Sequence, residues 1–272
     1  MGDRMFDLSK INDCLNTKVT GRTIIQYDTL NSTYLKSKNI FGTCPDGAVI
    51  LTENQTKWNV RMGKEWICCP DKNIYLSIIL KPKANNHLIS IYDVIGCSSI
   101  FSALKTMYGT EQIECKIKWP NDIIINGKKV SSVGSSLVNK NKKDIGVIIS
   151  IGINVNMSKE ELESTEEIKD GATSLLVETF QEADREKLIA EILNNVEEYY
   201  SEMISGKSAL SAVNIFNENS EINHKDIEII KKGKKSKNTV HVQGIDSEGG
   251  LVVINDRGNE EILIAGETTC LK

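Results

Sequence analysis

The residues with the richest chemistry are concentrated in one short stretch, Lys116–Asn126. It places a cation, a tryptophan, a proline, an amide and a carboxylate between two apolar runs, in the order Lys118-Trp119-Pro120-Asn121-Asp122. The proline has no N–H group, so it interrupts a strand ladder and turns the chain. Local chemistry alone favours a strand–turn–strand with the tryptophan in the core. The alternative is a binding site, because Asn and Asp side chains at a tight turn can hold a charged ligand or its metal.

A second candidate is the polar segment Gln55–Trp66, which combines two tryptophans with three cations. Long loops in compact domains are usually functional or disordered. Ordering the tryptophans over a ligand would bury a large apolar area. The cations could together neutralise a polyphosphate, and a solvated surface loop is the equal alternative. The residues concerned are Lys57, Trp58, Arg61, Lys64 and Trp66.

Two further stretches carry weaker signals. Gly152-Ile153-Asn154 ends a buried run with a glycine that permits close backbone approach and an amide that can bond a ribose or a phosphate. A strand ending in a turn is the commoner outcome for such a string. Lys128-Lys129 follow a predicted hairpin turn, and such lysines are usually solvated, although one can turn inward to meet an anion.

Several chemistries are excluded by the residues themselves. The histidines His87, His224 and His241 lie outside every candidate site, which argues against a His-based nucleophile or a zinc site. The seven cysteines are scattered without a Cys-x-x-Cys pair, which argues against a zinc cage or a disulfide framework. No Gly-rich P-loop or dinucleotide fingerprint occurs, so a nucleotide would need an atypical site.

The elements that must position these residues are mostly strands, with a few long helices. The pattern predicts helices over His87–Tyr108, Arg185–Met203 and Ala209–Asn217, and a short helix that begins after Ser32 and Thr33. In the first of these, apolar residues from Ile91 to Tyr108 should share one face, and small residues should let the helix lie close to a sheet. Strands are predicted over Thr23–Thr29, Gly47–Thr52, Asn73–Leu80, Cys115–Trp119, Ile123–Ile125, Lys129–Asn139 and Ile145–Val155.

Length and composition bound the protein class. A chain of 272 residues can hold a larger domain, expected over residues 1–220, and a small second one over residues 221–272 made of short strands with tight turns. The net charge of −4 gives no basic field for nucleic acid or an anionic membrane. The apolar runs are too short to span a membrane, and the first residues lack the apolar core expected of a signal peptide. We therefore expect a cytoplasmic protein.

The order of these motifs resembles that of the biotin–protein ligases over nearly the whole chain. The central pentapeptide looks like the signature of that family, and Asn31-Ser32-Thr33 resembles the Asp-Ser-Thr that helps to hold the ureido ring of biotin. Gln55–Trp66 lies where the family has its biotin loop, and Gly152–Asn154 resembles the Gly-Ile-Asn that meets the nucleotide. Ala172–Leu175 and the tail Gly244–Glu267 resemble a following short element and a small C-terminal barrel.

The departures from the family pattern lie in two places. The family loop reads Gly-Arg-Gly-Arg-x-Gly-Arg, whereas Trp58–Lys64 lacks two of its glycines and one arginine, so we expect incomplete loop closure. After the hairpin the family has Lys-x-x-Gly. One alignment keeps Lys129 and replaces the glycine by Ser132, and we prefer it to the alignment that keeps Gly134 and displaces the lysine.

The resemblance implies an α+β fold, with a mixed, mainly antiparallel sheet backed by helices and a small C-terminal SH3-like β-barrel. It implies that Mg-ATP activates biotin as biotinyl-5′-AMP, which then biotinylates a lysine of a carboxylase carrier domain. Joining two anions requires cations, with Arg61, Lys118 and Lys129 as candidates and Asp122 as a metal or amine contact. The implied biotin contacts are Ser32, Thr33, Gln55, Arg61 and Lys129, and the implied ATP contacts are Arg61, Lys64, Trp66, Asn121, Asp122, Lys129 and Asn154.

Two other functions remain open. A lipoate–protein ligase shares this fold and chemistry, but its Arg-Arg-x-Ser-Gly-Gly-Gly run is absent here. A non-catalytic paralogue that binds biotin or a carrier is the other alternative, because of the altered loop. The chain begins too close to Asn31 to hold a helix-turn-helix domain, so we expect a ligase without repressor function. Monomer and homodimer are equally compatible with the sequence.

Overall fold

The computed structural model of the protein describes residues 5–57, 69–82, 88–109, 113–140, 144–164, 171–231, 234–265 and 268–271. Its central feature is a seven-stranded sheet in the order β1-β2-β3-β7-β6-β5-β4. Only the first pair, β1 with β2, is parallel, and every other pair is antiparallel. The predicted mixed, mainly antiparallel sheet is confirmed. The strands are β1 (Ile24–Leu30), β2 (Ala48–Gln55), β3 (Ile74–Leu80), β4 (Cys115–Lys118), β5 (Asp122–Ile125), β6 (Lys128–Lys140) and β7 (Asp144–Ile153).

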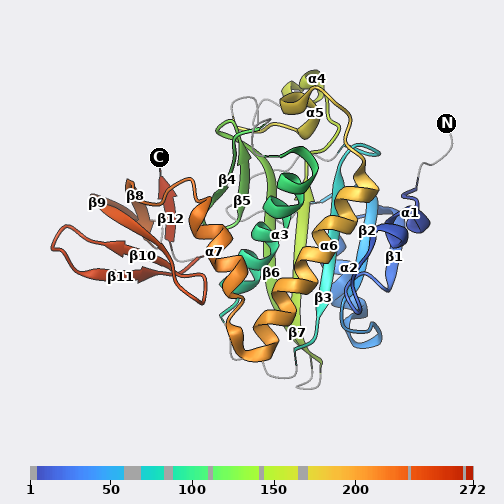
Figure 1. The fold of residues 1–272 in the computed structure, drawn as a ribbon, viewed down its shortest axis with the longest axis horizontal. Helices are drawn as coiled ribbons and strands as arrows, with labels where there is room; N and C mark the ends of the chain where they lie inside the picture. The colour runs from blue at the N-terminus through green and yellow to red at the C-terminus, as the bar shows by residue number, and fades with distance from the viewer. Residues whose placement is uncertain are drawn as a thin grey trace.

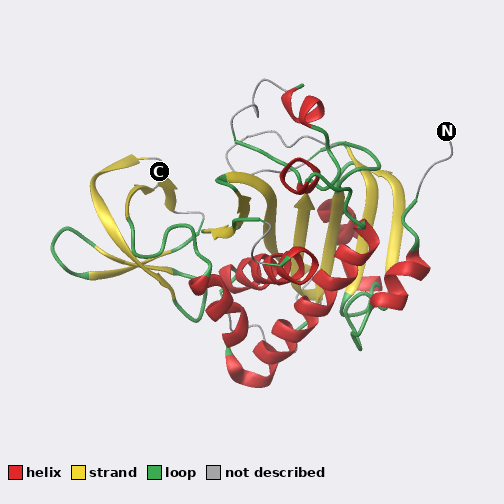
Figure 2. Ribbon diagram, turned by 45° about the horizontal axis from the view of Figure 1, so that its top comes forward, coloured by secondary structure: helices red, strands yellow, loops and turns green. Residues whose placement is uncertain are grey.

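Three helices cover one face of this sheet: α3 (Ser90–Tyr108), α6 (Arg185–Glu202) and α7 (Leu210–Glu218). Figures 1 and 2 show them layered on the same side of the strands. Gly96 permits the close approach of α3, since a Cβ there would lie 2.7 Å from Val133. The structure differs from the expectation that α3 would bury only one face. Residues all round the helix are buried, because α6 and α7 pack against the side that faces away from the sheet.

The opposite face of the sheet is covered at one end by α2 (Thr33–Ile40) and the 3-10 turn η1 (Phe41–Thr43). A second, smaller core forms here, in which Phe41 packs with alternate residues of the strands, among them Ile50, Ile79 and Ile148. Towards the other end of the same face the strand residues become polar. This part of the sheet holds the candidate site.

Three short helices were not predicted: α1 (Leu8–Cys14), α4 (Lys159–Glu163) and α5 (Leu175–Thr179). Side chains cap each of them, from Asp7, Ser158 and Ser174 respectively. A helix of one or two turns has too little apolar periodicity to stand out in a sequence. None of the helices in the described parts of the chain is both long enough and apolar enough to cross a membrane.

The C-terminal strands form a separate antiparallel sheet of five strands, in the order β11-β10-β9-β8-β12. They are β8 (Asp226–Lys231), β9 (Lys234–Ile245), β10 (Leu251–Ile254), β11 (Glu260–Leu263) and β12 (Thr268–Leu271). A small antiparallel C-terminal unit was predicted and is confirmed. Its closure into a barrel is not detected, because no pairing among the described strands joins β11 to β12. The domain boundary near residue 220 stays a prediction.

The two sheets are joined by the turn between β9 and β10. Trp119 donates its indole N–H to the carbonyl of Gly249 at 3.2 Å, and Ser90 donates to the carbonyl of Glu248 at 2.8 Å. Trp119 is buried, as the strand–turn–strand interpretation predicted. The tryptophan of the central stretch therefore connects the two sheets, while its neighbours Asn121 and Asp122 are left to form the site.

Candidate active site

The pairing register places a row of polar residues on the part of the sheet face that lies beyond α2 and the small core around Phe41. Residues paired across antiparallel strands share a face of the sheet. Lys118 pairs with Asp122, Asp122 with Ser132, Ser132 with Gly152, and Gly152 with Tyr75. The neighbouring row runs through Ser77, Ser150 and Gly134. Both rows lie on the face of Ile79 and Ile148, away from α3 and α6.

Asp122 is the centre of a cluster at one end of this face. Its Oδ2 atom lies 2.6 Å from the Nζ atom of Lys129, and its Oδ1 atom accepts a hydrogen bond of 2.8 Å from Ser132. The register between β5 and β6 shifts between Ile123 and Ile124, so that Lys129 pairs with Ile124. Ile124 is two residues from Asp122 and on the same face, so the Lys129 side chain can reach the carboxylate. The structure thus brings together the predicted cation and carboxylate with Ser132, the residue that the preferred alignment puts in place of the family glycine.

Asn121 and Lys118 flank this cluster. Asn121 is tied to β6 by its backbone, since Val133 N donates to its carbonyl at 2.9 Å, and its side-chain amide donates to the carbonyl of Val133. The amide therefore holds the turn in place. Lys118 is half-buried and lies opposite Asp122 in the register, so its side chain leaves the same face of the sheet.

Thr173 joins Lys129 to the predicted nucleotide contact Asn154. Its backbone N–H donates to the carbonyl of Lys129 at 2.8 Å, and its own carbonyl accepts from the Asn154 side-chain amide at 3.0 Å. The Oδ1 atom of Asn154 is buried and has no hydrogen-bond partner within the described residues. A buried acceptor of this kind requires a donor, which a ligand hydroxyl or amino group can supply.

Thr33, the first residue of α2, and Gln55, the last residue of β2, are hydrogen-bonded to each other. The backbone N–H and the hydroxyl of Thr33 donate to Gln55 Oε1 at 2.8 and 3.0 Å. Ser32 caps α2 by accepting from Leu35 N at 3.3 Å. The three residues predicted to contact one end of a ligand, Ser32, Thr33 and Gln55, are therefore adjacent and buried. Their assignment to a ligand stays a prediction.

The remaining predicted site residues, Arg61, Lys64 and Trp66, lie outside the described residues, as do Trp58 and Val60 of the same loop. The described residues on either side of that loop are fixed. Lys57 N donates to Asn31 O at 2.8 Å, beside Ser32, and Cys69 N donates to the Tyr75 hydroxyl at 2.9 Å. β2 also extends to Gln55, three residues beyond the predicted strand end at Thr52, so the first residue of the polar segment belongs to the strand.

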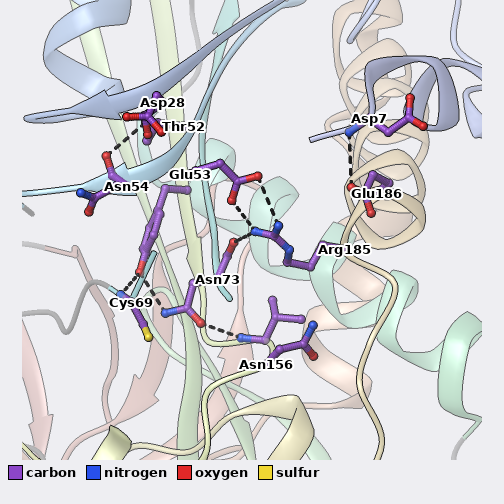
Figure 3. A network of polar contacts seen from close by, with 12 residues as sticks. Asp7, Asp28, Thr52, Glu53, Asn54, Cys69, Asn73, Asn156, Arg185 and Glu186 are labelled. Carbon is purple, nitrogen blue, oxygen red and sulfur yellow. Dashed lines mark hydrogen bonds and ion pairs between the residues drawn. The ribbon is translucent and has the colours of Figure 1, made fainter. Parts of the chain in front are cut away.

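Asn73 is a hydrogen-bonding centre that sequence reasoning missed. Its side chain accepts from Val155 N at 3.0 Å and donates to the Tyr75 hydroxyl at 2.9 Å, and its carbonyl accepts from Arg185 at 3.0 Å (Figure 3). Asn73 thus connects Val155, beside Asn154, to the Tyr75 hydroxyl, which in turn accepts from Cys69 after the loop. A polar residue opening an otherwise apolar strand was the signal available in the sequence.

Glu53 and Arg185 form a buried ion pair next to this centre, with N–O distances of 2.6 and 3.2 Å (Figure 3). Arg185 also lies over the ring of Phe6, 4.2 Å from its centroid. Burial raises the pKa of Glu53, and the bonds from Arg185 oppose that rise. The pair anchors the end of β2, just before Gln55, to the first residue of α6.

Cys69, the first described residue after the loop, does not have the properties of a nucleophile. Five described cysteines, among them Cys69, are free thiols. Burial raises the pKa of the Cys69 thiol, and the nearby carboxylate of Glu161 raises it further. Nucleophilic cysteines have a lowered pKa, so Cys69 is not poised as a nucleophile.

Comparison with known proteins agrees with this geometry. The profile of the biotin/lipoate A/B protein ligase family matches residues 25–156, which include Ser32, Thr33, Gln55, Asp122, Lys129 and Asn154. Over these residues the chain is similar to this family. It is 30% identical to the bifunctional ligase/repressor BirA of Bacillus spizizenii over 198 residues, and the match spans 72% of this chain and 59% of BirA.

Solved structures match over more of the chain. The biotin protein ligase of Aquifex aeolicus in complex with biotin and ATP superposes with a TM-score of 0.77 at 26% identity, covering 92% of this chain and 99% of that one. Among plant proteins, biotin–protein ligase 1 of Arabidopsis thaliana is 28% identical over 157 residues, which are 57% of this chain and 42% of that protein. The predicted family resemblance is confirmed.

Proposed function

We propose that this protein is an ATP-dependent biotin–protein ligase, which activates biotin as biotinyl-5′-AMP and transfers it to a lysine of a carboxylase carrier domain. The observation that carries the proposal is the cluster of Asp122, Lys129 and Ser132, connected through Thr173 to Asn154, on the face that also holds Thr33 and Gln55. The Aquifex aeolicus protein that shares this fold binds biotin and ATP.

In the first step, the biotin carboxylate would attack the α-phosphorus of ATP. The new C–O–P linkage forms biotinyl-5′-AMP, and pyrophosphate leaves with the bonding electron pair. Two anions meet in this step, so positive charge around the reacting atoms lowers its barrier. Lys129 and Lys118 are two described cations on this face, and Arg61 of the loop is the third cation that we propose.

Asp122 would position Lys129 for this role. The carboxylate holds the ammonium at 2.6 Å, and the Ser132 hydroxyl fixes the carboxylate from its other oxygen. A lysine held in this way loses less conformational freedom when an anionic ligand arrives. We propose Ser32, Thr33 and Gln55 as contacts of the biotin head group, because a buried hydroxyl and amide pair suits a polar ring.

Asn154 would bind the nucleotide through its buried, unpartnered Oδ1 atom, which needs a donor such as a ribose hydroxyl. Asn121 would support this end of the site by holding the turn. We also propose that Lys64 and Trp66 of the loop contact ATP.

Magnesium is part of the proposal only as a companion of ATP. No group of three or more His, Cys, Asp or Glu side chains in the described residues could hold a metal ion. Asp122, the predicted metal ligand, already has the ammonium of Lys129 beside it. That contact favours the alternative role for Asp122, an amine contact.

In the second step, the amine of the carrier lysine would attack the acyl carbonyl of biotinyl-5′-AMP. An amide forms, the acyl–phosphate bond breaks, and AMP leaves. Two relatives, from Paracoccus denitrificans and Mycobacterium tuberculosis, are named biotin–[acetyl-CoA-carboxylase] ligases. We propose a biotin carboxyl carrier domain as the partner, and the cytoplasm, where thiols stay reduced, as the place of the reaction.

A direct test combines the protein with biotin, ATP labelled at the α-phosphate, and a biotin carboxyl carrier domain. Labelled biotinyl-5′-AMP and a biotin-sized mass increase on the carrier lysine are expected. A carrier whose acceptor lysine is changed to arginine is the control and should stay unmodified. If biotin bound but neither product formed, the non-catalytic alternative would replace this proposal.

A further inference from the structure

Three hydroxyls and one amide form a continuous hydrogen-bonded chain at the polar end of the sheet face. Thr33 Oγ1 lies 3.0 Å from Gln55 Oε1, Ser77 Oγ lies 2.9 Å from Thr33 Oγ1, and Ser150 Oγ lies 2.9 Å from Ser77 Oγ. All four side chains are buried. The chain crosses from α2 and β2 to β3 and β7. Ser77 and Ser150 were not among the predicted site residues.

The direction of every proton in this chain follows from counting donors. The Thr33 backbone N–H also donates to Gln55 Oε1, at 2.8 Å, which identifies that atom as the amide oxygen, an acceptor only. The single hydroxyl proton of Thr33 must therefore point to Gln55. Ser77 must then donate to Thr33, which leaves Ser150 as the donor to Ser77. Each hydroxyl has committed its only proton.

The chain consequently ends at Ser150 with an oxygen that can only accept. Beyond Ser150 in the same row comes Gly134 of β6, which has no side chain. A Cβ placed at Gly134 would find no heavy atom of the described residues within 4 Å. Ser150, which is 8% exposed, pairs with Gly134, so its side chain lies on the same face as this space.

We propose that Ser150 is a specificity-determining residue, which accepts a hydrogen bond from an N–H group of the ligand's head group in the space over Gly134. The inference rests on the proposed function and deepens it. The head group of biotin is a cyclic urea with two N–H donors, whereas the dithiolane ring of lipoate has none. An oxygen that can only accept favours the urea, because a ring without a donor would leave it desolvated and unpaired.

The test measures binding by calorimetry to the complete protein. The ligands are biotin and two cyclic carbamate analogues, each with a ring oxygen in place of one ureido N–H. The unmodified protein should bind one carbamate isomer more weakly than biotin. The increase in Kd should be roughly 2- to 12-fold, which is what the loss of one neutral hydrogen bond typically costs. Ser150→Ala should weaken biotin by roughly the same factor and should lose the preference between biotin and that isomer.

Two further variants test the proton direction. Ser77→Ala removes the acceptor to which Ser150 donates, so the Ser150 hydroxyl becomes free to donate to a ring oxygen, and the penalty for the sensitive isomer should shrink. Ser136→Ala is the matched control. Ser136 is half-buried on the same face of β6, pairs with Ile148 and lies two residues from Gly134, and its loss should leave the preference intact.

The outcomes separate the two proposals. If Ser150→Ala bound biotin as tightly as the unmodified protein, or kept the preference for biotin over the sensitive carbamate, the role of Ser150 would be overturned while biotin binding stood. If the unmodified protein bound no biotin, the proposed function would fail first, and this inference with it.

Discussion

The ammonium of Lys129 lies 2.6 Å from the carboxylate of Asp122, across the hairpin that joins β5 and β6. The contact exists because the register shift beyond Lys129 lets its side chain turn towards the polar face of the sheet. It supports the alignment in which Lys129 is the family lysine. Gly134, the anchor of the other alignment, lies further along β6 and pairs with Ser150.

Replacing Lys129 with alanine should impair adenylation far more than folding. Removing one group that stabilises developing charge typically costs about 2–4 kcal/mol of transition-state stabilisation. The lost ion pair is partly exposed and should change the free energy of unfolding by about 1 kcal/mol or less. Rates of pyrophosphate exchange and urea unfolding curves measure the two effects. Lys128→Ala, at the exposed neighbouring position, should keep both near the unmodified values; equal losses in the two variants would refute a specific role for Lys129.

Replacing Arg185 with methionine should destabilise the protein strongly. Arg185 and Glu53 have side chains only 9% and 2% exposed, and breaking a buried pair leaves an uncompensated charge that costs about 3–5 kcal/mol. The double variant with Glu53→Gln should recover much of this loss, because no charge then remains buried. Chemical denaturation measures all three proteins. A double variant no more stable than Arg185→Met would contradict the explanation.

The same pair gives a pH dependence with a defined sign. Burial raises the pKa of Glu53, so the folded state holds this proton more tightly than the unfolded chain does. Its contribution to stability is therefore complete below the unfolded pKa and is lost as the pH rises through the folded pKa. Arg185→Met removes the contacts that oppose the rise and should move the folded pKa further up. Relative to the unmodified protein, the variant should thus lose more free energy of unfolding at pH 7 than at pH 5. An equal loss at both pH values would contradict a raised pKa of Glu53 in the variant.

Tyr75→Phe should loosen the end of the loop that contains Arg61. The phenol accepts from Cys69 N and from Asn73 Nδ2, each at 2.9 Å, and both donors would lose a buried partner. We expect the free energy of unfolding to fall by about 1–3 kcal/mol and preformed biotinyl-5′-AMP to dissociate faster. Tyr108→Phe is the control, because that hydroxyl has no partner in the described residues. An unchanged dissociation rate in Tyr75→Phe would show that the Tyr75 hydroxyl does not affect closure of the loop.

Gly249→Ala should weaken the contact between the two sheets. Gly249 has a φ of +81°, and an added Cβ would lie 2.9 Å from the backbone of Ser90. Gly258 also has a positive φ, of +76°, but no atom of the described residues lies within 4 Å of its Cβ position. Both alanine variants carry the strain of a left-handed backbone, about 1 kcal/mol, and only the first adds a clash. Unfolding curves should show Gly249→Ala to be less stable than Gly258→Ala by about 1–3 kcal/mol, and equal curves would exclude the close approach.

Most of the fold could be predicted because its elements are long and periodic. Arg185–Met203 was predicted as a helix and α6 covers Arg185–Glu202; the run Asn73–Leu80 became β3, Ile74–Leu80. The order of the strands in the sheet could not be derived from periodicity, because pairing depends on contacts between distant segments. The short helices α1 and α4 escaped for a related reason, since their caps define them better than their apolar residues do.

The candidate site residues were identified by the family resemblance, because their residue types alone favoured a turn, a solvated lysine and a strand end. Asp122, Lys129 and Asn154 are the residues concerned, and the structure connects them, while their roles stay predictions. Ser77 and Ser150 are small hydroxyls inside apolar strands, and their importance depends on a hydrogen-bonded chain that only the packed sheet assembles. The distant pair Glu53 and Arg185 had no local signal.

The central claim, activation of biotin by ATP, is tested most directly by ATP–pyrophosphate exchange, measured separately with biotin and with lipoate. The reaction needs no carrier domain, so it isolates the first chemical step. We predict exchange that depends on biotin and is absent with lipoate. Exchange with lipoate alone, or with neither acid, would contradict the account.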